Sequence, residues 1–170
     1  MKIMIASDIH GSQKYAQKLI AEYRKSGAKK LVLLGDLLYH GPRNDLSTGY
    51  NPKEVIKLLN SVKEELLCVR GNCDTEVDQM VLEFPIMADY AVMADGERLI
   101  YFTHGHKYGA AYFPNVKEGD IIVQGHTHIP MNEVRNGILC INPGSVSLPK
   151  DGSDHQCLIY EDGKFSPVKL

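Results

Sequence analysis

Several features that would assign a sequence to a class at once are missing here. No segment approaches the run of about 18 apolar residues that a membrane-spanning helix needs, so we expect no membrane association. The N-terminal stretch MKIMIASD reaches the charged residue Asp8 before the apolar part of a secretory signal could be complete. We therefore expect a cytoplasmic protein.

Cysteine is sparse, and its spacing suggests no zinc or redox motif. The four cysteines form no Cys-x-x-Cys pair; they are Cys68, Cys73, Cys140 and Cys157. Without a secretory signal, scattered thiols are typical of reduced residues in a cytoplasmic protein. Three of them lie in apolar, strand-like segments and are expected in the core. Cys73 differs because it lies inside a polar motif.

An excess of basic residues is also missing. The formal net charge is −2 at pH 7. Proteins that grip the backbone of long nucleic acids usually carry a basic stripe, often with interleaved aromatic residues, and none is apparent in the sequence. The charge balance therefore argues against a nuclease that acts on long DNA or RNA. A small nucleotide or another small diester stays open as a substrate.

What is present is an ordinary globular composition in a chain of 170 residues, with 44% hydrophobic and 24% charged residues. That length suits one domain with a sizeable core, and no repeat, low-complexity tract or linker divides the chain. We predict a single domain over residues 1–170.

The first half of the chain alternates apolar segments with helical patterns. Three segments are predicted to be buried strands: residues 2–7, 30–34 and 65–69. A helix is expected from about Gln13 to Lys25, with Ser12 as its N-cap and Gly27 at its end, and a second helix begins at Pro52. This β-α-β-α-β order implies parallel strands with right-handed crossovers.

The second half contains mostly short strand-like segments. Three dipeptides between them are typical of hairpin turns: Asp95-Gly96, Asn136-Gly137 and Asp162-Gly163. We predict an α/β fold whose first half is mostly parallel and whose second half is antiparallel.

Polar residues follow several predicted strands at the point where each strand ends. The clusters are Asp8-Ile9-His10-Gly11, Gly35-Asp36, Arg70-Gly71-Asn72-Cys73-Asp74, Thr103-His104-Gly105-His106 and Gly125-His126-Thr127-His128. The carboxyl ends of parallel strands meet at one edge of an open α/β sheet, so we expect these clusters to meet in space. Aspartate, asparagine and histidine side chains gathered at one place favour a metal site.

Each cluster alone has an ordinary structural explanation. Asp8 and His10 could belong to a turn, Gly35-Asp36 is common turn chemistry, and Asn72 could cap a helix. The histidines of the last cluster could lie on opposite faces of a strand. The metal interpretation is favoured because all of these independent explanations would otherwise have to hold together.

The order DxH, GD, GN, GH and GHTH resembles that of calcineurin-like metallophosphoesterases. The forms DIHGS, GDLLYHGPRN, VRGNCD, THGH, GHTHIP and INPGSVS are similar to the small bacterial and archaeal YfcE-type phosphodiesterases. The resemblance covers nearly the whole chain. It implies an α/β fold in which a two-sheet β-sandwich is flanked by helices, in an αββα arrangement, and it implies a binuclear metal site.

The resemblance also implies a role for each polar residue. Two metals would each be held by three residues of their own and by one shared, bridging residue. The first set is Asp8, His10 and His128, the second set is Asn72, His104 and His126, and the bridge is Asp36. The candidate catalytic residues are Asp36, Asn72 and Cys73.

The mixture of carboxylate, amide and imidazole ligands suits Mn²⁺, Fe²⁺ or Zn²⁺, whereas all-oxygen sites suit Mg²⁺ or Ca²⁺. We expect two divalent ions, with Mn²⁺ favoured and Zn²⁺, Fe²⁺ or Ni²⁺ as alternatives. Such a pair binds phosphoryl oxygens and lowers the pKa of a bridging water. The prediction is metal-dependent hydrolysis of a small phosphodiester by attack of a metal-bridging hydroxide.

Cys73 departs from the wider family, in which a histidine at this position is thought to steady the leaving oxygen or to donate a proton. A thiol donates a proton poorly to an alkoxide and carries no positive charge. We therefore expect slow hydrolysis that favours good leaving groups. The YfcE-like branch shares the GNCD form, and the alternative is that Cys73 only fills space beside Asn72.

The loop that follows Asp36 supplies candidate substrate contacts. Arg43 could pair with a phosphate oxygen and Asn44 could also touch the substrate, although a salt bridge within the loop would explain Arg43 equally well. His106 is expected to be a neighbour of the site rather than a ligand. Asp74 could orient a ligand, or it could be a surface or capping residue.

Two other functions stand as alternatives. A phosphomonoesterase could use the same two-metal core, because the sequence does not show the shape of the cleft. A non-catalytic scaffold is the second alternative, since a relative in eukaryotic membrane-trafficking coats resembles this fold and uses it for protein contacts; the filled ligand positions argue against it. By analogy with small domains of the family, a homodimer or higher homo-oligomer is expected.

Overall fold

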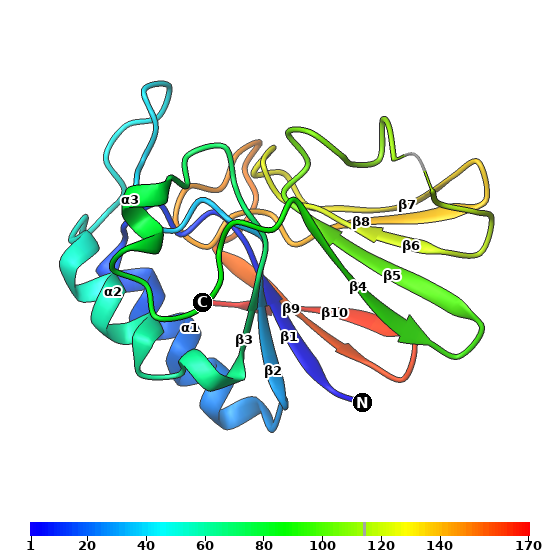
Figure 1. Cartoon of the computed structure of the whole chain (residues 1–170), viewed down its shortest axis with the longest axis horizontal. Coiled ribbons are helices and arrows are strands. Elements are labelled where there is room, and N and C mark those ends of the chain that lie inside the picture. The colour runs from blue at the N-terminus through cyan, green and yellow to red at the C-terminus, as the bar shows by residue number, and fades with distance from the viewer. Residues whose placement is uncertain (114) are drawn as a thin grey trace.

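Two five-stranded β-sheets lie face to face in the computed structural model, which describes residues 1–113 and 115–170 (Figure 1). The first sheet has the order β10 (Lys164–Lys169), β9 (Gln156–Glu161), β1 (Ile3–Ala6), β2 (Lys30–Leu33) and β3 (Leu66–Cys68). The second sheet has the order β4 (Tyr90–Asp95), β5 (Arg98–Thr103), β6 (Ile121–Val123), β8 (Ile138–Asn142) and β7 (Met131–Arg135).

The helices lie on the first sheet. Helices α1 (Gln13–Ser26) and α2 (Pro52–Asn60) cover its outer face, and the short segments η1 (Lys63–Glu65) and α3 (Glu76–Gln79) follow them (Figure 1). Every helical segment of the described residues precedes β4, so the chain that builds the second sheet has no helix to lay over its outer face. The predicted two-sheet α/β sandwich is confirmed, with its helices on one side. None of the described helices has the length and apolar character that would let it cross a membrane.

The ends of helix α1 follow from its sequence. The Ser12 hydroxyl accepts a hydrogen bond from the backbone N–H of Tyr15, which satisfies one of the free N–H groups of the first turn. Gly27 takes a left-handed conformation with φ of 73° and ends the helix. Both caps are those that the sequence predicts.

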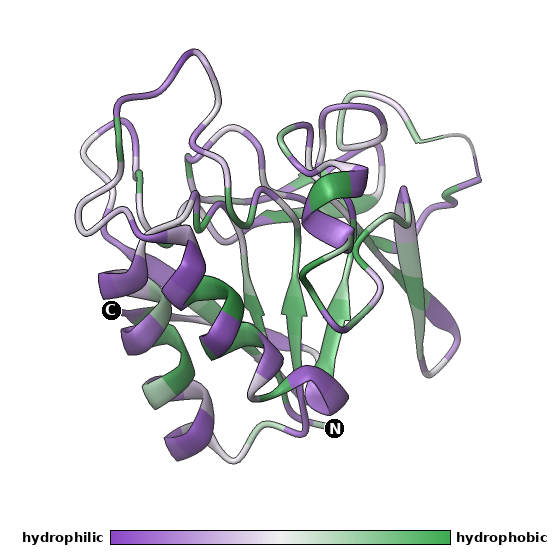
Figure 2. Ribbon diagram, turned by 60° about the vertical axis from the view of Figure 1, so that its left-hand side comes forward, coloured by the Kyte–Doolittle hydropathy of each residue, from purple (hydrophilic) through white to green (hydrophobic). Residues whose placement is uncertain are grey.

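Strand β1 contributes to two hydrophobic cores because successive side chains point to opposite faces of a strand. Ile3 and Ile5 are buried between the two sheets, in a cluster that includes Phe102 of β5. Met4 and Ala6 are buried against the helices instead. Figure 2 shows the result, with hydrophobic strands in the interior and hydrophilic faces on the outside of the helices. Full burial of a side chain such as Ile5 contributes about 1.5–3 kcal/mol to folding.

The strand directions agree with the sequence in the first half of the chain and differ in the second. Strands β1, β2 and β3 are parallel, as predicted. The three predicted turns do connect antiparallel hairpins, β4–β5, β7–β8 and β9–β10. The prediction of an antiparallel second half is nevertheless wrong, because β5, β6 and β8 pair in parallel. Turn residues signal a hairpin locally. A crossover between parallel strands carries the chain back to the end of the sheet where the previous strand began, and no short sequence pattern marks it.

This parallel pairing in both sheets places the loops after β1, β2, β3, β5 and β6 together. Backbone hydrogen bonds join these loops directly: Asp8 N–H donates to Gly35 O at 3.1 Å, and Gly125 N–H donates to His104 O at 2.9 Å. The loops gather along one end of the sandwich, at the top of Figure 1. The polar clusters of the sequence lie in these loops.

Candidate metal centre

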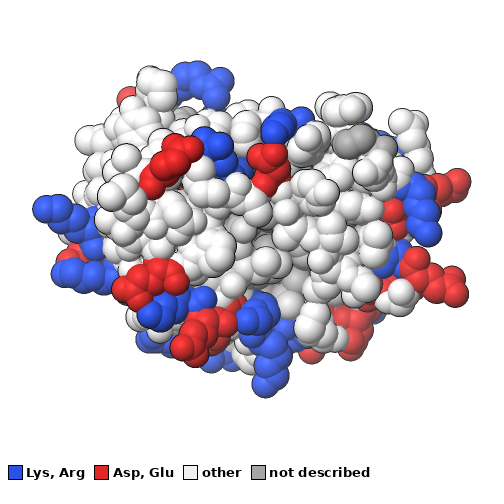
Figure 3. Space-filling view, in the orientation of Figure 1, with Lys and Arg blue, Asp and Glu red and all other residues white. Residues whose placement is uncertain are grey.

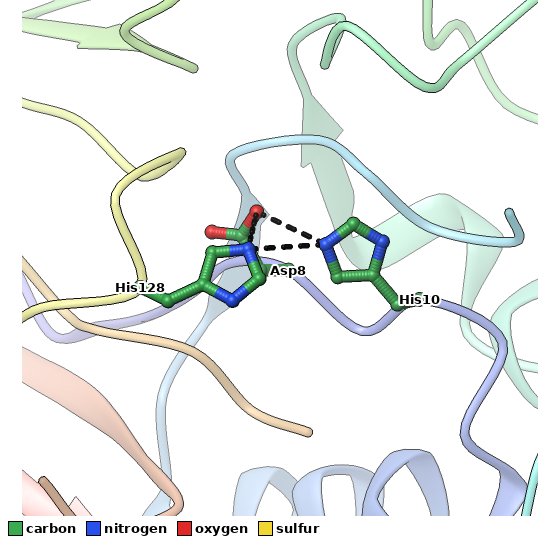
Figure 4. Close-up of side chains that lie close together, drawn as sticks. All are labelled: Asp8, His10 and His128. Atoms are coloured by element: carbon green, nitrogen blue, oxygen red, sulfur yellow. Dashed lines mark hydrogen bonds and ion pairs between the residues drawn. The ribbon is translucent and has the colours of Figure 1, made fainter. Parts of the chain in front are cut away.

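Asp8, His10 and His128 form one group of potential metal ligands (Figure 4). Asp8 and His10 follow β1, and His128 comes from the loop between β6 and β7. The Nε2 atoms of the two histidines lie 3.2 Å apart. Asp8 Oδ1 lies 3.5 Å from His10 Nε2 and 3.2 Å from His128 Nε2. Three donor atoms at these mutual distances could surround one cation.

A second group lies beside the first and consists of Asn72, His104 and His126. His104 Nε2 is 3.0 Å from Asn72 Oδ1 and 3.3 Å from His126 Nδ1. Asn72 follows β3, His104 follows β5 and His126 follows β6, so the group needs both sheets. The structure thus brings together the residues that the sequence places in the second set.

Asp36 joins the two groups. Its Oδ2 atom lies 3.7 Å from His10 Nε2 and 3.4 Å from His104 Nε2, so a single oxygen faces both sets. Its Oδ1 atom is held from behind by the backbone N–H of Cys73 at 2.8 Å. Burial alone would raise the pKa of Asp36, but the contact with His104 lowers it below its ordinary value, and the group is ionised. This position suits a bridging carboxylate.

Backbone carbonyls fix the rings of three histidines. The Nδ1–H groups of His10, His104 and His128 donate to Tyr39 O at 2.7 Å, Leu34 O at 2.7 Å and Leu148 O at 2.6 Å. In each ring this directs Nε2 into the centre, where its deprotonated form could bind a metal. Hydrogen bonds of this kind set the tautomer and orientation of metal-binding histidines.

Most of the predicted ligands also have a strained backbone conformation. Five of the seven predicted ligands have a positive φ: Asp8 at 60°, His10 at 45°, Asp36 at 56°, His126 at 69° and His128 at 62°. Side chains other than glycine rarely adopt this left-handed conformation, which costs roughly 1–3 kcal/mol at each position. Strain of this kind concentrates at functional sites, where the surrounding structure holds it in place.

Asp74 holds the backbone around Asp36 in place. It is buried, and its carboxylate accepts the backbone N–H groups of Asp36 at 2.8 Å, Leu37 at 2.9 Å and Gly71 at 2.7 Å. Burial raises the pKa of Asp74 to about 6, although the three N–H donors pull it down. Of the two roles that the sequence left open, orientation of the site agrees with this geometry, and a surface position does not.

The charge of the centre fits a cation. Burial raises the pKa of Asp8, yet its contacts with His10 and His128 lower it well below the ordinary value. Burial lowers the pKa of His104, but its contact with Asp36 raises it to about 9. Asp8 Oδ1 is buried and accepts no hydrogen bond. An orphaned, ionised oxygen within reach of two imidazole nitrogens is costly unless positive charge is present, and a bound divalent ion would supply it.

Comparison with known proteins agrees with this arrangement. The family model described as the calcineurin-like phosphoesterase superfamily domain matches residues 1–163. The chain belongs to this superfamily.

Two curated relatives and one solved structure are similar to this phosphoesterase. Phosphodiesterase YfcE of Escherichia coli strain K12 is 48% identical over 170 residues, which cover 100% of this chain and 92% of the relative. Probable metallophosphoesterase YsnB of Bacillus subtilis strain 168 is 31% identical over 157 residues, which cover 88% of this chain and 78% of the relative. The solved structure of YfcE, a phosphoesterase from E. coli, matches with a TM-score of 0.93 and 41% identity over 99% of both chains. The predicted family is confirmed.

Cys73 distinguishes this phosphoesterase from the wider pattern that the sequence suggested. Burial raises the pKa of its thiol to about 12, with the negative charge of Asp36 adding to the effect, so the side chain is neutral. Its sulfur accepts a hydrogen bond from Asn72 Nδ2 at 3.3 Å. The backbone of Cys73 supports Asp36, and the thiol contacts Asn72.

A cavity of about 230 Å³ opens over the centre of the phosphoesterase. The predicted substrate residues Arg43 and Asn44 line it together with Asp36, Asn72, Cys73, His126 and His128. The side-chain amide of Asn44 also donates a hydrogen bond to His40 O at 2.8 Å, which stabilises the loop that contains both residues. Arg43 makes no salt bridge with the described residues, so the loop salt bridge that would have explained it is not found there.

Two polar residues of the cavity wall, Thr127 and Lys150, are not among the predicted site residues. Thr127 stands between two ligands and could have been found by that position alone. Lys150 carries no such signal, because it reaches the cavity only through the fold of the loop after Asn142. The turn in that loop supports the centre: Asn142 Nδ2 donates to Gly125 O at 2.8 Å, and Ser145 Oγ donates to Asp8 O at 2.8 Å.

His106 lies beside the ligands. Its ring centroid is 5.3 Å from that of His104 and 6.2 Å from that of His126. Burial and the positive charge of His104 lower the pKa of His106. This is the neighbouring position that the sequence predicts for it.

Proposed function

We propose that this phosphoesterase is a metal-dependent phosphodiesterase that hydrolyses a small phosphodiester at the centre around Asp36. The observation that carries the proposal is the position of Asp36 Oδ2, which faces His10 on one side and His104 on the other within 3.7 Å and 3.4 Å. A shared carboxylate oxygen between two ligand groups is what a pair of divalent ions requires. The 48% identity to phosphodiesterase YfcE over the whole chain supports the reaction class.

Three residues would hold each metal and one would hold both. The first set is Asp8, His10 and His128, the second set is Asn72, His104 and His126, and Asp36 is shared. Two bound divalent ions supply Lewis acidity, which activates a water molecule and stabilises the charge that develops on the phosphoryl oxygens.

The charges of the predicted ligands and of the cavity wall favour binding of an anion. Only Asp8 and Asp36 among the seven ligands are anionic, so a loaded centre keeps a net positive charge that attracts phosphate. Arg43 and Lys150 add two cationic side chains to the wall of the same cavity. Arg43 would pair with a phosphate oxygen and Asn44 would donate an amide N–H to the substrate. Asn72, whose Oδ1 faces His104, would help to place the phosphoryl group.

Manganese is the metal that we propose for this centre. The donor set consists of carboxylate, amide and imidazole atoms, and the thiol of Cys73 has a pKa near 12 and offers no thiolate. Such a nitrogen and oxygen set suits Mn²⁺ as well as Fe²⁺, Zn²⁺ or Ni²⁺. A single domain, a cytoplasmic location and a homo-oligomer stay predictions from the sequence.

The face of the molecule shown in Figure 3 carries no arrangement of charges that would favour long nucleic acids. On the face shown in Figure 3, Lys and Arg alternate with Asp and Glu around the margin, and no basic stripe crosses the middle. Long nucleic acids are bound mainly through phosphates, which needs such a stripe. A small diester is the substrate class that fits.

The test is hydrolysis of bis(p-nitrophenyl) phosphate beside p-nitrophenyl phosphate. Chelator-stripped protein would be assayed with and without Mn²⁺, with Asp36→Ala as the inactive variant and Asp154→Ala, an exposed residue that pairs with Lys169, as its matched control. We expect Mn²⁺-dependent turnover of the diester that exceeds turnover of the monoester and that Asp36→Ala loses. Faster turnover of the monoester would favour a phosphomonoesterase. Silence on both esters, in protein that binds two metals, would favour the scaffold.

A further inference from the structure

A second hollow lies beside the metal centre, and Cys73 belongs to the walls of both. Its volume is about 450 Å³, and it is formed by the start of the loop after β2, by helix α2 and by helix α3. Most of the lining side chains are apolar or aromatic: Leu38, Tyr39, Tyr50, Ile56, Val77 and Val81. We call this hollow the apolar groove.

The walls of the apolar groove are unusually exposed for apolar side chains. Tyr39 is 43% exposed, Val77 is 68% exposed and Val81 is 43% exposed. Single exposed apolar residues are ordinary, but a contiguous set that lines one hollow marks a binding surface. The rim includes Lys53 and Asp78, one of each charge, so the groove presents no excess of charge to an anion bound nearby.

Two tyrosines of the groove are held by His40. The His40 ring lies edge-on to Tyr39 at a centroid distance of 4.7 Å and edge-on to Tyr50 at 5.5 Å. Tyr39 is also fixed through its backbone, because its carbonyl accepts the Nδ1–H of the ligand His10 at 2.7 Å. The aromatic wall is therefore connected to the metal centre by a hydrogen bond. Aromatic rings held in this way favour flat, apolar ligands.

The position of Cys73 defines which ligand fits. Its N–H donates to Asp36 Oδ1 at 2.8 Å, so this residue touches the bridging carboxylate on one side and the apolar groove on the other. Cys73 lines the cavity over the centre as well as the groove, so a phosphate bound at the centre would lie beside it. An organic group on such a phosphate would extend past Cys73 toward the apolar groove.

We propose that the apolar groove binds an aromatic ester group of the substrate while its phosphate lies at the metal centre. The substrate class is then a phosphodiester with at least one aryl or similarly flat, apolar group. This inference rests on the proposed function, because it takes the metal centre as the phosphate site. Because Cys73 lies in the walls of both the groove and the cavity over that centre, part of the substrate is favoured as the occupant over a second copy of the chain.

The test measures binding directly, so that it does not depend on turnover. Isothermal titration of the Mn²⁺-loaded full chain gives the Kd of phenylphosphonate and of methylphosphonate, which carry the same headgroup and differ in the organic group. Burial of the ring should make phenylphosphonate bind about tenfold more tightly. Val77→Ser and Val81→Ser should each reduce this ratio about threefold or more. Val134→Ser is the matched control, because Val134 is 67% exposed but lies on β7 of the other sheet.

Each outcome either supports binding of the ester group in the apolar groove or contradicts it. Equal Kd values for the two phosphonates in the wild type would overturn the proposal, as would a ratio that Val77→Ser and Val81→Ser leave unchanged. Sedimentation velocity of the same variants tests whether a second copy of the chain occupies the groove. Loss of an oligomer with no change in the ratio of Kd values would make the groove an interface between copies. If the ratio behaves as expected but no diester is hydrolysed, the proposed function fails and the groove stands.

Discussion

The backbone N–H of Cys73 donates a hydrogen bond of 2.8 Å to Oδ1 of Asp36, and this contact turns Oδ2 of the same carboxylate toward His10 and His104. Any residue at position 73 except proline could make this bond, because it uses only the main chain. The side chain at position 73 is therefore free to vary while the bridging carboxylate stays in place. The backbone of Cys73 can therefore orient Asp36 whether or not its side chain takes part in the reaction.

Cys73→His should change how turnover depends on the leaving group. A histidine can donate a proton to the leaving oxygen, which the neutral thiol does poorly, and general acid help of this kind contributes roughly 10²–10⁴-fold. We expect the rate on diphenyl phosphate to rise at least about tenfold relative to the rate on bis(p-nitrophenyl) phosphate, because phenol is the poorer leaving group. The measurement is kcat/KM on both diesters.

Cys73→Ser serves as the control for this comparison, since it keeps the backbone bond and adds no general acid of suitable pKa. If the histidine variant changes the two rates by the same factor, position 73 does not act on the leaving group. The sulfur lies close to Gly41, so the histidine ring requires a small shift of that loop, which circular dichroism and the metal content of the variant would reveal.

Asp74→Asn should weaken both the fold and the metal centre. The carboxylate of Asp74 accepts three backbone N–H groups, from Asp36, Leu37 and Gly71. An amide offers one oxygen and turns its NH₂ toward at least one of these donors, so the free energy of unfolding should fall by about 1–3 kcal/mol. Because two of the donors flank the bridge, Mn²⁺ affinity should fall about 10–100-fold. Thermal unfolding and metal titration check the two effects.

Asp154→Asn is the comparison for the loss of one carboxylate, because Asp154 is exposed and pairs only with Lys169 among the described residues. It should leave both quantities close to the wild type. An Asp74→Asn protein that binds Mn²⁺ with wild-type affinity would show that the three hydrogen bonds do not position Asp36.

Gly71→Ala should damage the centre for a purely steric reason. A Cβ at Gly71 would meet the backbone nitrogen and Oδ1 of Asp36, and neither can move without displacing the bridge. We expect a loss of about 1–3 kcal/mol in the free energy of unfolding and a loss of bound metal. Metal content by elemental analysis, together with denaturant unfolding, checks this.

Gly152→Ala separates steric damage from backbone strain. Gly152 has a φ of 70° and open space around its Cβ position. Alanine there should cost about 1–2 kcal/mol through its left-handed conformation while the metal content stays at the wild-type value. Equal metal loss in the two variants would mean that general destabilisation, not contact with Asp36, empties the centre.

Metal affinity should rise with pH. In the metal-free protein the contact with Asp36 overcomes the effect of burial and raises the pKa of His104 to about 9, so this ring carries a proton at neutral pH. A cation must displace that proton, so apparent affinity should increase as the pH approaches 9 and level off above it. At pH 7 binding should release roughly one proton from His104.

Calorimetry of Mn²⁺ binding in buffers with different ionisation heats measures the released protons. The His104→Gln variant, which has no titrating ring at this position, should release about one proton fewer at pH 7. Binding that releases no proton at pH 7 would contradict the charged state that the contact with Asp36 implies for His104.

Local signals in the sequence were sufficient to predict the candidate centre. Glycine-flanked Asp, Asn and His residues at strand ends indicated a metal site, and the family resemblance named the seven predicted ligands. Local signals were enough for helix α1, the first three strands and the three hairpin turns. These features depend on residues close together in the chain, where spacing, caps and turn preferences act directly.

How the segments meet follows from long-range contacts that the local sequence does not predict. The parallel pairing of β5, β6 and β8, the burial of Asp74 under the bridge and the arrival of Lys150 in the cavity all join residues far apart in the sequence. The left-handed conformations of five predicted ligands are likewise imposed by the surrounding structure, because isolated residues of these types rarely adopt them. Contacts between distant segments override the conformational preferences of individual residues. A short stretch of sequence shows only those preferences.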